Sequence, residues 1–185
     1  MKRSILSAMV ILLSALLIAE AQTFTDIVEM YPSGVNGGSI PGDTTGVYKR
    51  NLNRILGDAN GIQLDTSTSR VLLPGGTWRI SVSAPANVFG GHRTGVVIYY
   101  ADTSQGIRYQ WWGTSGAIYE VSEAAVPIVN ARSYVVVPML CVETPTWIEV
   151  RQYAVATVLS TTNLGMATND GWDEIYTTAT FQRLQ

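Results

Sequence analysis

The sequence predicts an all-β protein, an antiparallel jelly-roll sandwich of about eight to ten strands. Three observations support this fold class. Turn-forming residues recur about every 8–12 positions, the segments between them are rich in β-branched and aromatic residues, and no helical period is convincing after the N-terminal apolar run. Such a rhythm is typical of sandwiches and jelly rolls and not of folds that alternate helices with strands.

Residues 1–21 are predicted to be a signal peptide. Lys2 and Arg3 form a basic start, residues 5–19 are apolar with small serines, and Ala19-Glu20-Ala21 fits a signal peptidase site. The apolar run is shorter than the roughly 20 residues that span a bilayer. The alternative is an uncleaved N-terminal anchor, which would be the chain's membrane contact. Both readings place the mature chain outside the cytoplasm, secreted or at the cell surface.

Residues 22–49 are predicted to be an extended arm or linker ahead of the domain. The segment YPSGVNGGSIPGD is rich in glycine and proline and has no sustained period. Two roles remain open for it, because an arm can reach a neighbouring molecule or serve as a plain flexible leader. The jelly-roll domain itself is predicted over residues 50–185.

The elements of the domain follow from local pattern. The segment NLNRILG, residues 51–57, fits a short helix or a first strand, and strands are expected at 62–64, 71–73, 77–84, 94–101, 107–112, 117–121, 133–142, 146–159 and 172–183. In 77–84, Trp78, Ile80 and Val82 share one face, and Pro85 ends the strand. Strands 94–101 and 133–142 are apolar on both faces, as in an interior or interface strand.

Five segments carry a resemblance to a known family. They are Leu52-Asn53, LPGGTWRISVSAPA, GGHRTGVVIYYADTSQG, WWGTSGAIYE and NLGMATNDGWDEIYTTATFQRL, in this order over roughly residues 51–184. In these five segments taken together, the chain resembles the receptor-binding jelly rolls of phage tail fibres, which are similar in architecture to C1q and tumour-necrosis-factor domains. The resemblance implies a homotrimer of jelly rolls, exposed on a fibre or a virion, with a recognition role.

Catalytic chemistry is sparse in this sequence. His92 is the sole histidine and lies in GGHR, where a turn is expected, and no nucleophile can be placed beside it from spacing. Asp173 and Glu174 are neighbours on a predicted strand and so point to opposite faces, while Glu120 and Glu123 lie near a loop. We therefore expect that the protein is not an enzyme, and an exported glycan hydrolase is the least favoured alternative.

The sequence also offers few residues for metal binding or thiol chemistry. With one histidine and one cysteine, a zinc site lacks ligands. Asp58, Asn60 and Asp65 in GDANGIQLD lack the spacing of a calcium-binding EF-hand loop. We expect no cofactor and no metal. Cys141 lies in the apolar segment VVVPMLCVE, which predicts a buried thiol.

Aromatic residues supply the best candidate binding chemistry. They gather within about twenty residues, and their flat faces suit stacking on sugar rings or filling a partner's pocket. The candidate ligand-binding residues are Tyr99, Tyr109, Trp111, Trp112, Arg93 and Arg108. In a strand, Trp111 and Trp112 would point to opposite faces, so one of them is expected to face outward or into a subunit interface, although both could be core or trimer contacts.

Charge bounds the choice of partner. The net charge is −2 with no basic stripe, which argues against nucleic acid. The charged fraction of 14% is low and favours surface hidden in an oligomer. The leading hypothesis is a non-enzymatic trimer that binds a cell-surface glycan or protein receptor. A structural subunit of an extracellular filament, fibre or virion decoration is the alternative.

Overall fold

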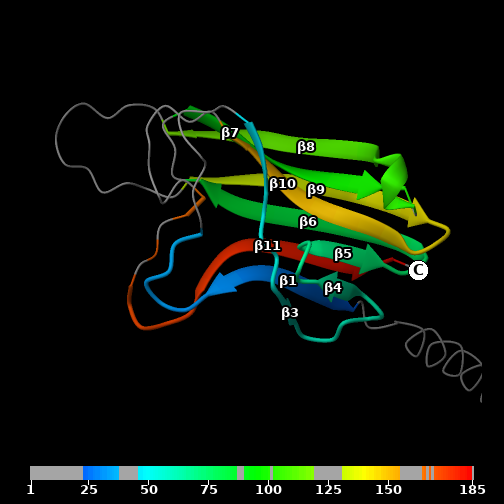
Figure 1. The fold of residues 1–185 in the computed structure, drawn as a ribbon, viewed down its shortest axis with the longest axis horizontal. Helices are drawn as coiled ribbons and strands as arrows, with labels where there is room; N and C mark the ends of the chain where they lie inside the picture. Colours follow the sequence, from blue (N-terminus) through cyan, green and yellow to red (C-terminus); the bar gives the residue numbers. More distant parts are fainter. Residues whose placement is uncertain are drawn as a thin grey trace, which may run out of the picture.

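The protein folds as a β-sandwich of two antiparallel sheets (Figure 1). The computed structural model describes residues 23–37, 46–86, 90–100, 102–118, 131–154, 164–165, 167 and 169–184. Within these ranges the regular structure is β-strand, apart from one 3-10 turn at Thr103–Gln105. The predicted all-β sandwich is confirmed.

The strands in chain order are β1 (Phe24–Tyr31), β2 (Gly46–Lys49), β3 (Arg54–Leu56), β4 (Gln63–Asp65), β5 (Arg70–Leu73), β6 (Gly76–Ala86), β7 (Gly90–Tyr99), β8 (Ile107–Ile118), β9 (Ala131–Val142), β10 (Thr146–Ala154) and β11 (Glu174–Arg183). Sheet A has the order β3-β1-β11-β6-β9. Sheet B has the order β8-β7-β10-β5-β4, and β2 also pairs with β10.

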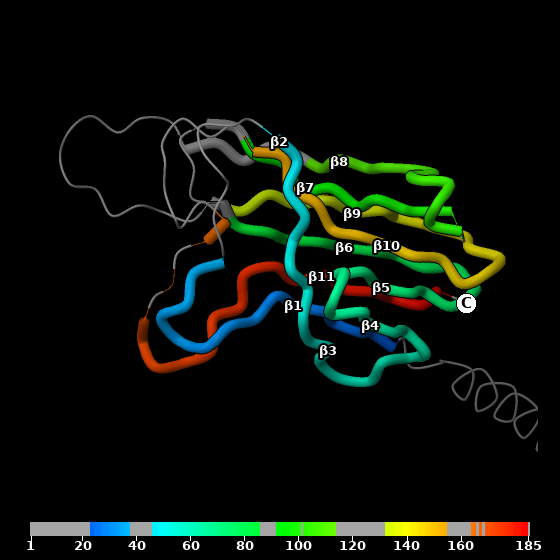
Figure 2. The backbone as a smooth tube through the Cα atoms, in the orientation of Figure 1, coloured from blue at the N-terminus to red at the C-terminus, as the bar shows by residue number. Residues whose placement is uncertain are grey.

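Pairing between distant strands defines the topology. β1 pairs with β11, β5 with β10, β6 with β9 and β7 with β8, all antiparallel. The chain from β2 to β3 passes from sheet B to sheet A, as the cyan tube in Figure 2 shows.

The two sheets are joined at one corner, where β8 pairs with β9 through Thr114 and Tyr134. Gly113 permits this close approach, since a Cβ atom at that position would lie only 1.6 Å from the carbonyl oxygen of Tyr134. The corner thus depends on a residue without a side chain.

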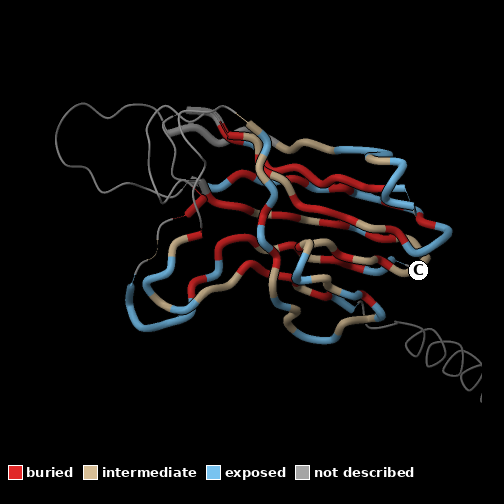
Figure 3. The backbone as a smooth tube through the Cα atoms, in the orientation of Figure 1, coloured by how far each residue is buried: buried red, intermediate tan, exposed pale blue. Residues whose placement is uncertain are grey.

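The hydrophobic core lies between the sheets. Trp78, Ile80 and Val82 all point inward and are at most 2% exposed, which confirms the alternation predicted for this strand. Val96 and Val97 are both fully buried, so β7 is covered on both faces as expected. Figure 3 shows the buried stretches running along the strands.

The prediction of a separate arm is wrong for two of its segments. β1 lies between β3 and β11 in sheet A, where Ile27 is fully buried, and β2 pairs with β10. β1 was missed because FTDIVEMY mixes charged and apolar residues, and its partner strand is at the other end of the sequence. The ambiguous segment NLNRILG contains strand β3 and no helix.

β9 corrects a second expectation. Val135 and Val137 point into the core, but Tyr134, Val136 and Cys141 are exposed on the outer face of sheet A. The thiol of Cys141 is therefore not buried. The register of β9 against β6 shifts between Val137 and Leu140, and this bulge reverses the alternation, so Leu140 points inward and Cys141 outward.

The predicted signal peptide lies outside the described residues, as do Glu120 and Glu123. In the part of the chain that the structure describes, no helix has the length and apolar character needed to cross a membrane.

Candidate functional site

The outer face of sheet B gathers most of the predicted binding residues. On β7, His92, Thr94, Val96 and Ile98 point inward, so the alternate residues point outward. Across the sheet, the register aligns Lys49, Arg151, Gly95 and Trp112 in one outward row, and Val47, Tyr153 and Arg93 in the next.

Trp112 lies flat against this face. A Cβ atom on Gly95 would be 2.6 Å from the indole Cε3 atom, so the absence of a side chain there makes room for the ring. Trp111 is on the opposite face and packs against the core. The predicted opposition of the two tryptophans is confirmed. Tyr109 shares the face of Trp111, and their ring centroids are 5.8 Å apart.

A charged network covers the middle of sheet B. Glu149, only 3% exposed, accepts hydrogen bonds from Arg70 (3.2 Å) and Arg151 (2.5 Å). Arg151 also donates to the Tyr99 hydroxyl at 2.7 Å, and the guanidinium of Arg70 lies 4.2 Å from the Tyr99 ring centroid. Tyr99 is 5% exposed, and with Arg70 over its ring it is the least suited of the six predicted residues to stack on a ligand.

Arg108 belongs to a separate cluster at the end of sheet B. Its guanidinium is 5.2 Å from the Tyr109 ring centroid and 6.0 Å from that of Tyr100. Tyr100, Ile107 and Tyr109 are between 40% and 51% exposed. The structure therefore divides the six predicted residues between an outer face, with Arg93, Trp112 and Tyr99, and an end or edge, with Arg108, Tyr109 and Trp111.

Sequence reasoning missed several members of the outer face, namely Lys49, Arg70, Glu149, Arg151 and Tyr153. The alternation of 146–159 did place Glu149, Arg151 and Tyr153 on one side. It could not show that β2 and β5 would lie end to end along β10 and add Lys49 and Arg70.

The outer face of sheet A has different chemistry. Its centre, on β11, β6 and β9, consists of uncharged residues: Ser81, Ser83, Thr178, Thr180, Tyr134 and Val136. Tyr134 is 53% exposed and Val136 is 48% exposed. A hollow of about 210 Å³, lined mainly by apolar surface, lies among these residues. Met139, 65% exposed, and Cys141 extend the apolar character along β9.

A buried polar network crosses the interior between the sheets. Arg50 is fully buried and forms an ion pair of 2.6 Å with Glu29. Arg50 also donates to Thr177 (2.7 Å), Gln152 (2.9 Å) and the carbonyl of Leu164 (2.8 Å). Most of the hydrogen-bond donors of the guanidinium thus have an acceptor, which a buried charge requires.

His92 ends this network and is fully buried, so the expectation of a turn at GGHR is corrected: the residue is inside β7. Its Nδ1 atom is 3.2 Å from Gln152 Nε2 and 3.1 Å from Ser133 Oγ. Its Nε2 atom has no hydrogen-bond partner among the described residues. Burial, with a further contribution from the charge of Arg50, lowers the pKa of His92.

The Ser133–His92 pair has the atoms of a nucleophile and its base, but not their access. Ser133 is 1% exposed, and Thr94 lies 2.7 Å from its hydroxyl. A nucleophile must meet its substrate, and neither group reaches the surface. The geometry supports a structural role for this pair.

The remaining carboxylate candidates serve local structure. Asp173 is exposed, whereas Glu174 is buried and accepts from the backbone of Asn169 at 3.1 Å, which confirms their opposite directions. Asp65 accepts hydrogen bonds from Ser67 and Thr68, which lower its pKa to about 2. No group of three or more potential metal ligands occurs among the described residues.

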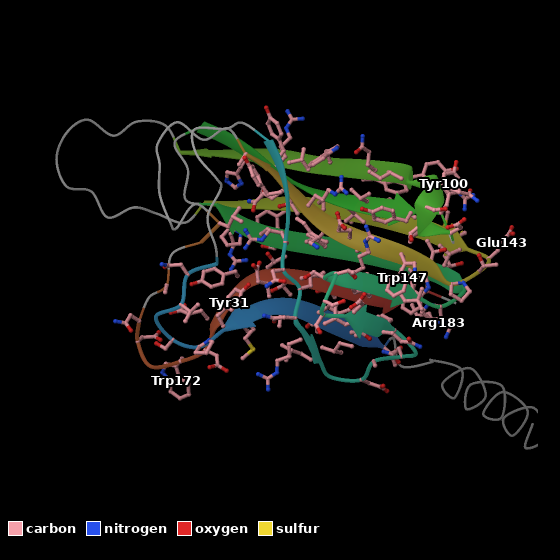
Figure 4. All side chains as sticks on the ribbon, viewed as in Figure 1. Tyr31, Tyr100, Glu143, Trp147, Trp172 and Arg183 are labelled. Carbon is pink, nitrogen blue, oxygen red and sulfur yellow. The ribbon has the colours of Figure 1, made fainter. Side chains whose placement is uncertain are left out.

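The most exposed aromatic residue of the described chain was not predicted as a site. Trp172 is 77% exposed, and its backbone amide donates to Asp170 at 3.0 Å in the turn that starts at Asn169-Asp170-Gly171. Figure 4 places Trp172 at the opposite end of the sandwich from Tyr100. The sequence signal was an Asn-Asp-Gly turn followed directly by an aromatic residue.

A scan against protein-family models finds no match for this chain, and a search of curated proteins finds none either.

Proposed function

We propose that this protein is an exported, non-enzymatic recognition domain that forms a homotrimer of jelly rolls and binds a cell-surface glycan. In this proposal, the outer face of sheet A packs against sister copies, and the outer face of sheet B meets the ligand. The protein would act at the cell surface, in the extracellular space, or on a virion if a phage encodes it.

The strand pairing supports the jelly-roll part of the proposal. Taking β1, β5, β6, β7, β8, β9, β10 and β11 as eight main strands, the first pairs with the last, the second with the seventh, the third with the sixth and the fourth with the fifth. This nested pairing is what a long antiparallel hairpin produces when it rolls up into two four-stranded sheets.

The observation that carries the proposal is the contrast between the two outer faces. Sheet A exposes Tyr134 and Val136 in an uncharged centre, with Arg132 and Asp26 at its margin, whereas the centre of sheet B exposes arginines and an indole. Exposed apolar patches mark protein contacts, while aromatic faces flanked by arginines suit ligands that carry hydroxyl or acidic groups.

Two measurements test the proposal. Light scattering or native mass spectrometry of the purified protein at micromolar concentration should give three copies, and binding to immobilised polysaccharides should be measurable. A clean monomer at that concentration would contradict the trimer.

The structural-subunit alternative also gains support from sheet A, because an apolar face serves assembly with or without a ligand. A trimer or larger assembly that binds neither polysaccharides nor cell-surface proteins would favour it.

A further inference from the structure

We propose that the outer face of sheet B selects an acidic polysaccharide, with Lys49, Arg93 and Arg151 contacting its acidic groups and Trp112 stacking on a sugar ring. This inference rests on the proposed recognition function and adds the chemical class of the ligand. It names the binding surface, which we call the basic band, as Lys49, Arg93, Arg151, Trp112 and Tyr153.

The register of the strands brings the basic band together. Lys49 pairs with Arg151, Arg151 with Gly95 and Gly95 with Trp112, so one straight row crosses four strands. Directly paired residues lie roughly 5 Å apart on such a face. Arg93 and its partner Tyr153 occupy the adjacent outward position on the same strands. Three cations from three strands are thereby held on one side of the sheet.

Among the described strands of this face, the cations outnumber the carboxylates: Lys49, Arg70, Arg93 and Arg151 stand against Glu149 and Asp65. Glu149 is shared between Arg70 and Arg151, so one carboxylate serves two guanidiniums. Lys49 donates to the carbonyl oxygen of Thr68 and forms no ion pair with any residue that the structure describes. The exposed side chain of Arg93 forms no hydrogen bond or ion pair with any other residue that the structure describes.

This local excess of positive charge stands out in a protein whose net charge is −2. Opposite charge between a surface and its partner steers association and discriminates among partners. A guanidinium binds a carboxylate or sulfate through strong charge-assisted hydrogen bonds.

The indole supplies what a simple ion-binding surface would lack. Trp112 lies on the backbone at Gly95, next to Arg151 in the same row, with its orientation fixed by the strand beneath it. An apolar ring face beside cations fits a sugar that carries an acidic group. The sugar ring can stack on the indole while its acidic group forms hydrogen bonds with the arginine.

Nucleic acid fits the basic band less well. Non-specific binding to nucleic acid depends on many phosphate contacts along a basic stripe. Three cations on a face that also holds Glu149 provide few such contacts.

The test compares two polysaccharides and two variants of the full chain. Binding of a polyuronate and of a neutral dextran of similar length is measured by calorimetry at two salt concentrations. Arg93→Gln removes one cation of the basic band, and Arg54→Gln is the matched control, because Arg54 is an exposed arginine on sheet A. Thermal melting of both variants checks that each is folded.

We expect binding to the polyuronate and not to dextran, weaker binding at the higher salt, and an affinity about tenfold lower for Arg93→Gln. Arg54→Gln should bind as the native protein does. Equal binding of both polysaccharides with no effect of Arg93→Gln would overturn the acidic selectivity and leave the recognition function standing. Binding to neither would count against both, and tighter binding of single-stranded DNA than of the polyuronate would overturn the ligand class.

Discussion

The two outer faces of this sandwich are built from the same pleated backbone but differ in the chemistry of their centres. On sheet A, Val136 is as exposed as Val47 on sheet B, at 48% each. Val136 is surrounded by serine, threonine and tyrosine, whereas Val47 lies next to Tyr153 in a row that contains Arg93. Equal exposure thus occurs in two settings, one suited to a dry contact and the other to a charged partner.

The contrast teaches that the hydrophobicity of a single strand does not show which outer face of a protein is left open for contacts with other molecules. β9 and β7 are both apolar on two faces in sequence. The second face of β7 is covered by the network of Arg70, Glu149 and Arg151 together with Trp112, but the second face of β9 is left open. The difference comes from neighbouring strands.

Breaking the corner that holds the two faces in place should have the largest effect. In Gly113→Ala, the new methyl group would overlap the Tyr134 carbonyl, so β8 could not cross to β9. We expect the free energy of unfolding to fall by at least about 3 kcal/mol, measured by urea denaturation. Gly57→Ala is a control, since it meets no atom within 4 Å, although its φ of 80° adds its own strain. An unchanged free energy of unfolding in Gly113→Ala would refute the steric role of the corner.

A charge on sheet A should separate the copies. Val136→Arg places a cation in the uncharged centre of that face, and we expect the mass in light scattering to fall from three copies to one. Val47→Arg makes the same change at equal exposure on sheet B and should leave the mass unchanged. Dissociation by Val47→Arg alone would assign the contact to the wrong sheet.

The reactivity of the Cys141 thiol can be used to measure whether the outer face of sheet A is covered. Its thiol lies on the outer side of β9, 3.7 Å from the hydroxyl of Thr77. If sister copies cover sheet A, a thiol reagent should label the native protein at least about tenfold more slowly than Val136→Arg, because covered thiols are poorly accessible. Equal labelling rates, followed by absorbance, would show that the face is open.

Acidification should weaken the interior that separates the faces, by a smaller amount. Because the pKa of His92 is lowered by burial and by Arg50, the unfolded state binds a proton more readily than the folded state. The free energy of unfolding should therefore decrease as the pH falls below about 6.5. In His92→Gln, this part of the pH dependence of the melting temperature should disappear; an unchanged slope would assign it to other groups.

The fold class was predictable because period-two alternation reports directly on which side of a strand is buried, as Trp78, Ile80 and Val82 show. The burial of His92 and the exposure of Cys141 were not predictable. Each depends on which distant strand lies alongside, and single-strand patterns contain no such information. The same limit explains why β1 was taken for part of an arm, and why Arg93 was found as a candidate while Lys49 and Arg151 were not.

The pairing of β1 with β11 also constrains how the chain reaches its native state. β11 follows β1 by more than a hundred residues, so β1 has no permanent neighbour on that side until β11 has been synthesised. Arg50 donates to the hydroxyl of Thr177, 127 residues further along the chain, so this buried hydrogen bond also forms only once β11 is present. Such non-local contacts slow folding. We therefore expect the pairing of β1 in sheet A to be completed late in folding, after β11 is available.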